Sequence, residues 1–194
     1  MSKVAIQGNA DGTGTFTIAA PNSDTDRTLT LPNEAGTVLT SASGIDKSQF
    51  PSGSIINVST DLVGGQVSYT NSGVLSFIKE FSYTPLYSDS SLFCMVHMNG
   101  ISNGGSGRLE LRLNIDTSSG SGSSGTQIAN GQVALDGAGT NHLGASSLSA
   151  VTSLGDTNTR YIKVFAYKND TSTTWYVNQY DGSPICFTVM EIAG

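Results

Sequence analysis

The chain has 194 residues and a net charge of −6 at neutral pH, an acidic balance that excludes a protein coating nucleic-acid phosphates, because such a protein needs a basic face. Charged residues make up only 12% of the chain, and its 23 glycines lie among long stretches of Ser, Thr and Asn. This composition favours a turn-rich β protein over a helical one. The 37% apolar content is enough for a packed core, so a disordered chain is excluded as well.

The start of the chain carries no targeting signal that we can identify. Residues 1–7 have neither the apolar segment nor the cleavage site of a signal peptide, and no apolar run approaches the roughly 20 residues of a membrane-spanning helix. The sequence therefore predicts synthesis in a cytoplasm and no membrane partner. In that reducing compartment Cys94 and Cys186, each within an apolar stretch, are expected to be buried thiols rather than a disulfide.

The first predicted elements are short strands in an N-terminal arm at 1–45. Thr alternates with apolar residues at 14–20 and 27–31, which is the period of a strand with one dry face, and turn residues separate these stretches. About forty such residues bury too little apolar surface to be stable alone. The arm is therefore expected to lie against another surface, either the rest of this chain or another chain.

A linker is predicted at 46–53, closed by Pro51 and Gly53, and it is followed by a module at 54–194. Candidate strands of the module lie at 54–60, 66–70, 74–83, 91–99, 108–115, 126–135, 146–151, 159–168, 173–178 and 185–192. No helical period separates them. The predicted fold is all-β, an antiparallel β-sandwich of the jelly-roll kind with an extended β-rich N-terminal arm.

The strands differ in how many of their faces are apolar. Residues 108–115 alternate between apolar and polar, whereas 92–98 and 185–192 are apolar on both faces. A sandwich buries only one face of each sheet, so two strands that are apolar on both faces predict a further layer that covers the other face. Contact between subunits and a packed loop are the two alternatives.

Motifs that suggest cofactor binding or catalysis have plainer interpretations. Residues 120–125 match G-x-G-x-x-G, but no helix period follows them, and a flexible surface loop is expected in place of a dinucleotide site. His97 lies in a doubly apolar strand and is expected to be a hydrogen-bonded core or interface imidazole. His142 lies in a loop with no carboxylate nearby in sequence, so no catalytic site is predicted.

The carboxylates give the same result. Asp116, Asp136, Asp156 and Asp170 would have to converge in space to form a hydrolytic pair, yet each neighbours residues typical of turns. No calcium-loop pattern is present, since 24–26 supplies too few oxygen ligands. The sequence predicts no enzyme activity, no metal site and no cofactor.

Two segments carry a resemblance to a known class of proteins. The stretch GTFTIAAPNSDTDRTLTLPNEAGTVLT, residues 14–40, resembles a segment widespread in structural proteins of tailed bacteriophages, notably of cyanobacteria and marine bacteria. Residues 51–194 are similar to β-sandwich modules that close many phage virion proteins, although 100–160 match nothing specific. Such modules occur on capsid cement or decoration proteins and on tail fibres, and they commonly form trimers.

The resemblance implies a non-enzymatic virion protein, and the order of segments favours one role. A fibre needs a shaft, whereas here a short arm precedes one module. We therefore expect a capsid decoration or cement protein, a homotrimer that binds major capsid protein on the head surface and stabilises the shell. One alternative is a tail fibre or tail-tip protein with a receptor-binding β-sandwich. Another is a lectin-like module, suggested by a cluster of aromatic residues late in the chain. Outer loops are candidates for contact with host-surface glycans. The expected partner-binding residues are Phe16, Ile18, Leu29, Leu31, Val38 and Leu39.

Overall fold

The computed structural model describes residues 8, 10–15, 17–19, 21–26, 28, 30, 47–70, 73–103, 107–122, 124–135, 142–168, 174–177 and 184–194. The chain divides into two compact units, Met1–Ser41 and Ala42–Gly194, and each is described by itself. The division into an arm at 1–45, a linker and a module stays a prediction. We refer to the second unit as the module.

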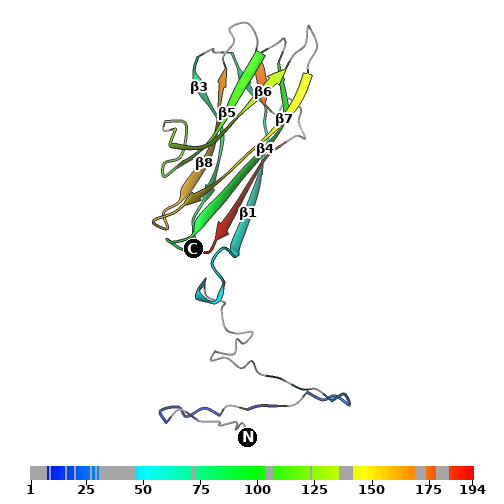
Figure 1. Ribbon diagram of the computed structural model, residues 1–194, viewed down its shortest axis with the longest axis vertical. Helices are drawn as coiled ribbons and strands as arrows, with labels where there is room; N and C mark the ends of the chain where they lie inside the picture. Colours follow the sequence, from blue (N-terminus) through cyan, green and yellow to red (C-terminus); the bar gives the residue numbers. More distant parts are fainter. Residues whose placement is uncertain are drawn as a thin grey trace. The chain divides into compact units, whose positions relative to one another are not determined.

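The described part of the module is built from strands, with one short 3-10 helix, η1 (Lys47–Gln49). The strands are β1 (Ile55–Val63), β2 (Val67–Tyr69), β3 (Leu75–Tyr83), β4 (Ser91–Asn103), β5 (Gly107–Asp116), β6 (Thr126–Leu135), β7 (His142–Ser153), β8 (Arg160–Lys168), β9 (Trp175–Val177) and β10 (Ile185–Ile192) (Figure 1). Each overlaps a predicted strand. The largest differences are at β4 and β7, which pair with each other far beyond their predicted ends. The Ser-rich start of β7 has little apolar alternation, so its extent depends on that pairing.

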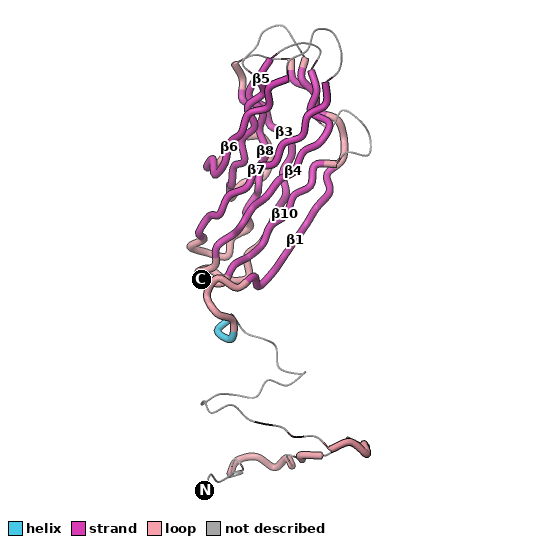
Figure 2. Tube along the Cα trace, turned by 45° about the vertical axis from the view of Figure 1, so that its right-hand side comes forward, coloured by secondary structure: helices cyan, strands magenta, loops and turns pink. Residues whose placement is uncertain are grey.

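The strands form two antiparallel sheets that pack as a sandwich. Strands β1, β10, β4 and β7 lie side by side in one sheet, and β3, β8, β5 and β6 in the other (Figure 2). Without the short β2 and β9, this is the strand order of a jelly roll, in which the chain passes repeatedly between the two sheets. The predicted all-β, jelly-roll-like sandwich is confirmed.

The two short strands extend one end of the first sheet. Strand β2 pairs with β9, and β9 pairs with the last residues of β4, at Ser102 and Asn103. This is possible because β4 is 13 residues long and pairs with β10 only over Ser91–His97. The remaining edge of β4 is therefore free to receive β9.

The core lies between the sheets and follows the period of two in the strands. Alternate residues of β4, from Leu92 to Met98, are fully buried, and β5 buries Leu109, Leu111 and Leu113 in the same way. Strands β8, β9 and β10 complete the core with Ile162, Val164, Ala166, Trp175, Val177, Ile185, Phe187 and Val189. Burying a Val, Leu, Ile or Phe side chain stabilises the fold by about 1.5–3 kcal/mol each. This cluster supplies the main driving force for folding.

The two strands predicted to be dry on both faces have one buried face each. In β4, Phe93 and Met95 alternate with the core residues and remain half-buried. In β10, Met190 is half-buried on the same side, while Glu191 points inward and is fully buried. The covering layer, from another subunit or from a packed loop, stays a prediction.

The arm departs from its prediction. None of the described residues between 8 and 30 lies in a strand, and all of them are exposed. The strands predicted at 14–20 and 27–31 are therefore wrong at these positions. Alternation sets which side chains share a face, but a strand forms only where a neighbouring strand accepts and donates its backbone hydrogen bonds.

Candidate functional site

The stretch before β1 is fixed to the C-terminus of the module. The Gly53 N–H donates to the Ala193 carbonyl at 2.8 Å, and the Ala193 N–H donates to the Ser54 carbonyl at 2.8 Å. At η1, the Phe50 N–H donates to the Lys47 carbonyl at 3.0 Å. The segment predicted as a linker thus has defined structure from residue 47. Local composition could not reveal this, because the partner lies at the other end of the chain.

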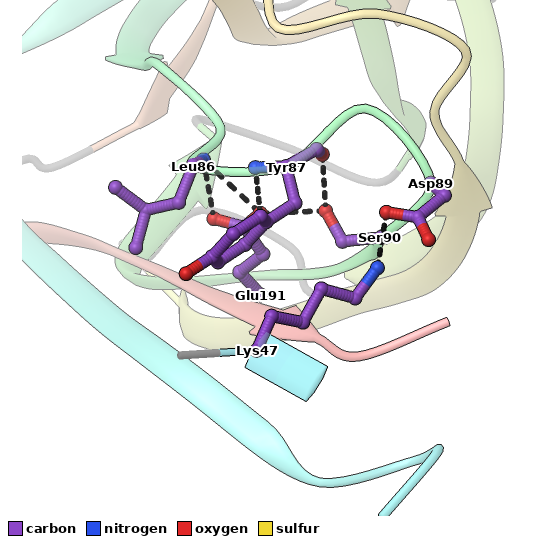
Figure 3. A network of polar contacts seen from close by, with 6 residues as sticks. All are labelled: Lys47, Leu86, Tyr87, Asp89, Ser90 and Glu191. Carbon is purple, nitrogen blue, oxygen red and sulfur yellow. Dashed lines mark hydrogen bonds and ion pairs between the residues drawn. The ribbon is translucent and has the colours of Figure 1, made fainter. Parts of the chain in front are cut away.

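Lys47 ties η1 to the loop between β3 and β4. Its ammonium forms an ion pair with Asp89 and lies 5.5 Å from the centre of the Tyr87 ring (Figure 3). The hydrogen bond from Lys47 holds the pKa of Asp89 below its usual value. Asp89 is largely exposed, so solvent screens this pair. Its role is to orient the chain where it enters the module.

Glu191 organises the same loop from inside. One carboxylate oxygen accepts hydrogen bonds from the Ser90 hydroxyl at 2.6 Å and from the Tyr87 and Leu86 N–H groups at 3.0 and 3.1 Å. The other accepts from the Tyr83 hydroxyl at 2.8 Å and from the Leu86 N–H at 2.9 Å. We call these five residues the Glu191 cluster, and Figure 3 shows all of them except Tyr83.

The pKa values of the Glu191 cluster follow from this geometry. Burial alone would raise the pKa of Glu191, but the donors from Leu86, Ser90, Tyr83 and Tyr87 outweigh it and lower the pKa below 4.5. Burial and the neighbouring carboxylate raise the pKa of Tyr83 above its usual value. At neutral pH the cluster is therefore a buried carboxylate compensated by neutral donors, a structural arrangement that holds residues 86–90 in place.

Of the predicted arm contacts, only one can be placed. Ile18 is 76% exposed, as a side chain available to a partner would be. Phe16, Leu29, Leu31, Val38 and Leu39 lie outside the described residues. The six residues as a contact site therefore stay a prediction.

A second candidate surface is the outward side of the β1–β10–β4–β7 sheet, visible in Figure 2 as four adjacent strands. Strand register places Val58, Met190, Phe93 and Val151 in one row across it. We define the outer face as this row and its neighbours: Ile55, Ile192, Ser91, Ser153, Val58, Met190, Phe93, Val151, Thr60, Thr188, Met95, Ser149, Leu62, Cys186, His97 and Ser147. None of these residues is charged. Residue patterns within single strands did not reveal this face, because it depends on register between four strands.

The other sheet presents a different outward side. Arg108, Glu110 and Arg112 project from β5, and Lys163 lies on the neighbouring β8. Arg112 forms an ion pair with Glu110 at 2.7 Å. This side therefore has the charged character that the outer face lacks.

Lys163 is fully buried, and the side chains of its register neighbours, Glu80 on β3 and Asn114 on β5, bind the loop between β5 and β6. The Gly120 N–H donates to Glu80 at 2.9 Å, and the Asn114 side chain donates to the Ser124 carbonyl at 2.7 Å. This Gly-Ser-rich loop contains the G-x-G-x-x-G pattern. As its composition indicates, its own side chains do not anchor it in these contacts; side chains of the sheet bind its backbone instead, which the sequence did not reveal.

A shallow, open pocket of about 240 Å³ lies where this loop meets the sheet. It is lined by Ile115, Asp116, Thr117, Gly125, Thr126 and Arg160. Asp116 is paired with Lys163 at 2.8 Å and Arg160 with Asp156 at 2.7 Å, so the charges at its rim are already compensated. Its volume is below the about 300–1,000 Å³ typical of small-molecule sites.

Asp116 and Asp156, the two described members of the four predicted turn carboxylates, both stabilise turns of the backbone. Asp116 accepts a hydrogen bond from the Thr117 N–H at 2.7 Å, and Asp156 accepts one from the Asn158 N–H at 2.8 Å. Asp136 and Asp170 lie outside the described residues. No group of three or more His, Cys, Asp or Glu side chains suited to a metal ion occurs in the described part of the chain.

His97 makes two hydrogen bonds on the outer face. Its Nδ1 lies 2.6 Å from the Ser147 Oγ on β7, and its Nε2 lies 2.9 Å from the Asn99 Oδ1. The three side chains have the residue types of a nucleophile, a base and an orienting group. They lie on the sheet opposite the one that forms the described pocket. The side chain of His142 is not described.

Both thiols are free, with Cys94 fully buried in the core and Cys186 half-buried on the outer face. The prediction of free thiols in place of a disulfide is confirmed, and the predicted burial holds for Cys94 but is wrong for Cys186. Burial raises the pKa of the Cys94 thiol to about 12. None of the helices in the described residues has the length and apolar character to cross a membrane.

Comparison with known proteins assigns no family. No family model matches the chain, and no curated protein is significantly similar to it. Among solved structures, the chain is similar to one titled "Structure of infectious bursal disease virus Gx strain", with a TM-score of 0.29 and 14% identity. The match covers 71% of this chain and 36% of that chain. A likeness of this degree carries no functional conclusion.

Proposed function

We propose that this protein is a non-enzymatic structural component of a phage virion, a homotrimeric decoration protein that binds major capsid protein on the head and stabilises the shell. The resemblance of residues 14–40 to phage virion proteins supports a place in the virion. The jelly-roll strand order is also used by viral capsid domains, although lectins and other proteins share it. The fold is therefore compatible with the role without specifying it.

The observation that carries the proposal is the exposure of the arm. Ile18 is 76% exposed in a segment whose described residues form no strand. An apolar side chain in such a segment gains stability by docking on a partner surface, either through its apolar stripe or through strand addition to a sheet edge. Three arms on one trimer would act together, so each one needs only modest affinity.

The test compares an apolar and a polar position of the arm. We expect Ile18→Asp to weaken binding to purified heads that lack this protein, because it replaces an exposed apolar side chain by a charge. Thr17→Asp, at the neighbouring polar position, is the matched control and should bind as the wild type does. Equal binding by both variants would contradict the arm mechanism.

Copy number tests the location in the virion separately. Quantitative mass spectrometry of purified particles should find hundreds of copies if the protein decorates the head. A handful per particle would assign it to the tail, where a receptor-binding role becomes the better explanation. Contact of the outer loops with host-surface glycans stays a prediction.

A further inference from the structure

The outer face differs from its counterpart on the other sheet in one decisive property. It contains no Asp, Glu, Lys or Arg across four strands, while the outward side of the other sheet carries Glu80, Arg108, Glu110 and Arg112. Its exposed apolar side chains lie on the two outermost strands, with Val58 and Leu62 on β1 at 51% and 64% and Val151 on β7 at 62%. Phe93, Met95, Met190, Ile192 and Cys186 fill the strip between them, half-buried.

The size of this face fits a protein contact. Strands lie about 4.8 Å apart and rise about 3.4 Å per residue, so four strands over the paired run Cys186–Ile192 span about 450 Å² before side-chain relief is counted. This footprint includes the Ser, Thr and His positions of the face, so its apolar part is smaller. A stable interface buries about 800 Å² on each partner. The outer face would supply the flat centre of such an interface, and residues around its rim would supply the remaining buried area.

We propose that the outer face is the contact surface between copies of this chain. Each copy carries a net charge of −6, so two copies repel unless they meet where charge is absent. In the proposed trimer the outer faces of the three copies meet around the threefold axis, and because the face carries no charge, no like charges oppose each other there. Enrichment in Met and Phe with depletion of charge is also the composition of an interface centre.

The inference deepens the proposed function, because a decoration protein that acts through several arms requires its copies to associate. Its test needs no virion. If the protein fails to bind heads, the association of its copies can still be measured. If the protein is monomeric, its arm could still bind heads. The two proposals can therefore fail independently.

The first measurement is the oligomeric state of the full chain by sedimentation velocity at micromolar concentration. We expect the wild type to associate and Val151→Glu to raise the dissociation constant by roughly 100-fold or more, because the contact would bury an unpaired charge. Val151 is exposed on an edge strand, so the substitution leaves the core intact. Asn130→Glu adds the same charge on β6, the exposed edge strand of the other sheet, and should associate as the wild type does.

The two native thiols provide a second measurement. Cys186 lies on the outer face, so a maleimide probe should label it in Val151→Glu. Cys94 lies in the core and should stay unlabelled in both the wild type and the variant. In the associated wild type, Cys186 should be protected by at least tenfold. Mass spectrometry of digested protein assigns the labelled cysteine.

Three outcomes would overturn the proposal. The first is a monomeric wild type whose Cys186 is labelled as fast as in Val151→Glu. The second is a monomeric wild type with protected Cys186, which would mean that another part of the same chain covers the face. The third is an oligomer that Val151→Glu does not weaken, which would place the contact elsewhere. Labelling of Cys94 in a variant would mean that it had unfolded, and Val58→Glu, at the opposite edge of the face, would then replace it.

Discussion

Replacing Glu191 by glutamine removes one charge from the interior and changes little in size. The amide nitrogen would occupy the position of the oxygen that accepts from the Tyr83 hydroxyl and from the Leu86 N–H. The remaining oxygen would keep the bonds from Tyr87 and Ser90, now to a neutral acceptor. The variant therefore tests the carboxylate itself and leaves the shape of the cluster in place.

The expected loss follows from the number of bonds affected. A hydrogen bond to a charged group contributes about 1.5–3 kcal/mol and a neutral one about 0.5–1.5 kcal/mol. The Tyr83 hydroxyl could accept a bond from the amide nitrogen, but the Leu86 N–H would face another donor and lose its bond to this position. With that bond lost and the others now made to a neutral group, we expect Glu191→Gln to lower the free energy of unfolding by about 2–4 kcal/mol. The control is Glu110→Gln, which breaks the surface pair with Arg112 and should cost at most about 1 kcal/mol.

Urea denaturation, followed by the fluorescence of Trp175, measures the free energy of unfolding of both variants. The slope of this free energy against urea concentration should be the same for both. The pH dependence gives an independent check. Because the pKa of Glu191 in the folded state lies below 4.5, its contribution is complete above that pH and is lost as the pH falls further. The difference between wild type and Glu191→Gln should therefore shrink below about pH 4.5. A loss under 0.5 kcal/mol at neutral pH would refute the reasoning.

Three further predictions concern the loop and metal ions. Lys163→Met should lower the free energy of unfolding by about 3–5 kcal/mol, because it removes the buried cation that faces the Asp116 carboxylate. Adding Asp116→Asn should restore part of the loss in the same assay, and no recovery would contradict the coupling of the two side chains. Gly125 has a φ of +63°, and a Cβ there would collide with a backbone carbonyl. Gly125→Ala should therefore lower the free energy of unfolding by about 1–3 kcal/mol and speed proteolysis of residues 117–125. Gly122→Ala is the control, because a Cβ at Gly122 meets open space and should have neither effect. Exhaustive EDTA treatment should leave the melting temperature unchanged, since the described residues contain no group of three or more His, Cys, Asp or Glu side chains suited to a metal ion; a fall of several degrees would contradict this.

The module's strands could be predicted because burial imposes a period of two on the sequence. Leu109, Leu111 and Leu113 show that period directly, and the buried half of β4 shows it as well. Glycine, proline, serine and asparagine mark the ends of these strands, since turns require them. The arm shows the limit of such patterns. Its alternation is as clear as that of β5, yet its described residues form no strand, because no neighbouring strand completes their backbone hydrogen bonds.

Other features depend on residues that only folding brings together. The sequence places Glu191 in an apolar strand, and nothing nearby shows that it would receive donors from residues 83–90, about a hundred positions away. The Gly-Ser loop has no side chains to fix it, but Glu80 and Asn114 bind its backbone from the sheet.

The sequence by itself determined the all-β class, the approximate strands and the free thiols, because these follow from local periodicity and composition. The tertiary structure decided which sheet face is uncharged, how the loop is held and where the buried carboxylate finds its donors. Each of these depends on register between strands that are distant in the chain. A shift of one residue in a strand would reverse its two faces without changing the composition at all.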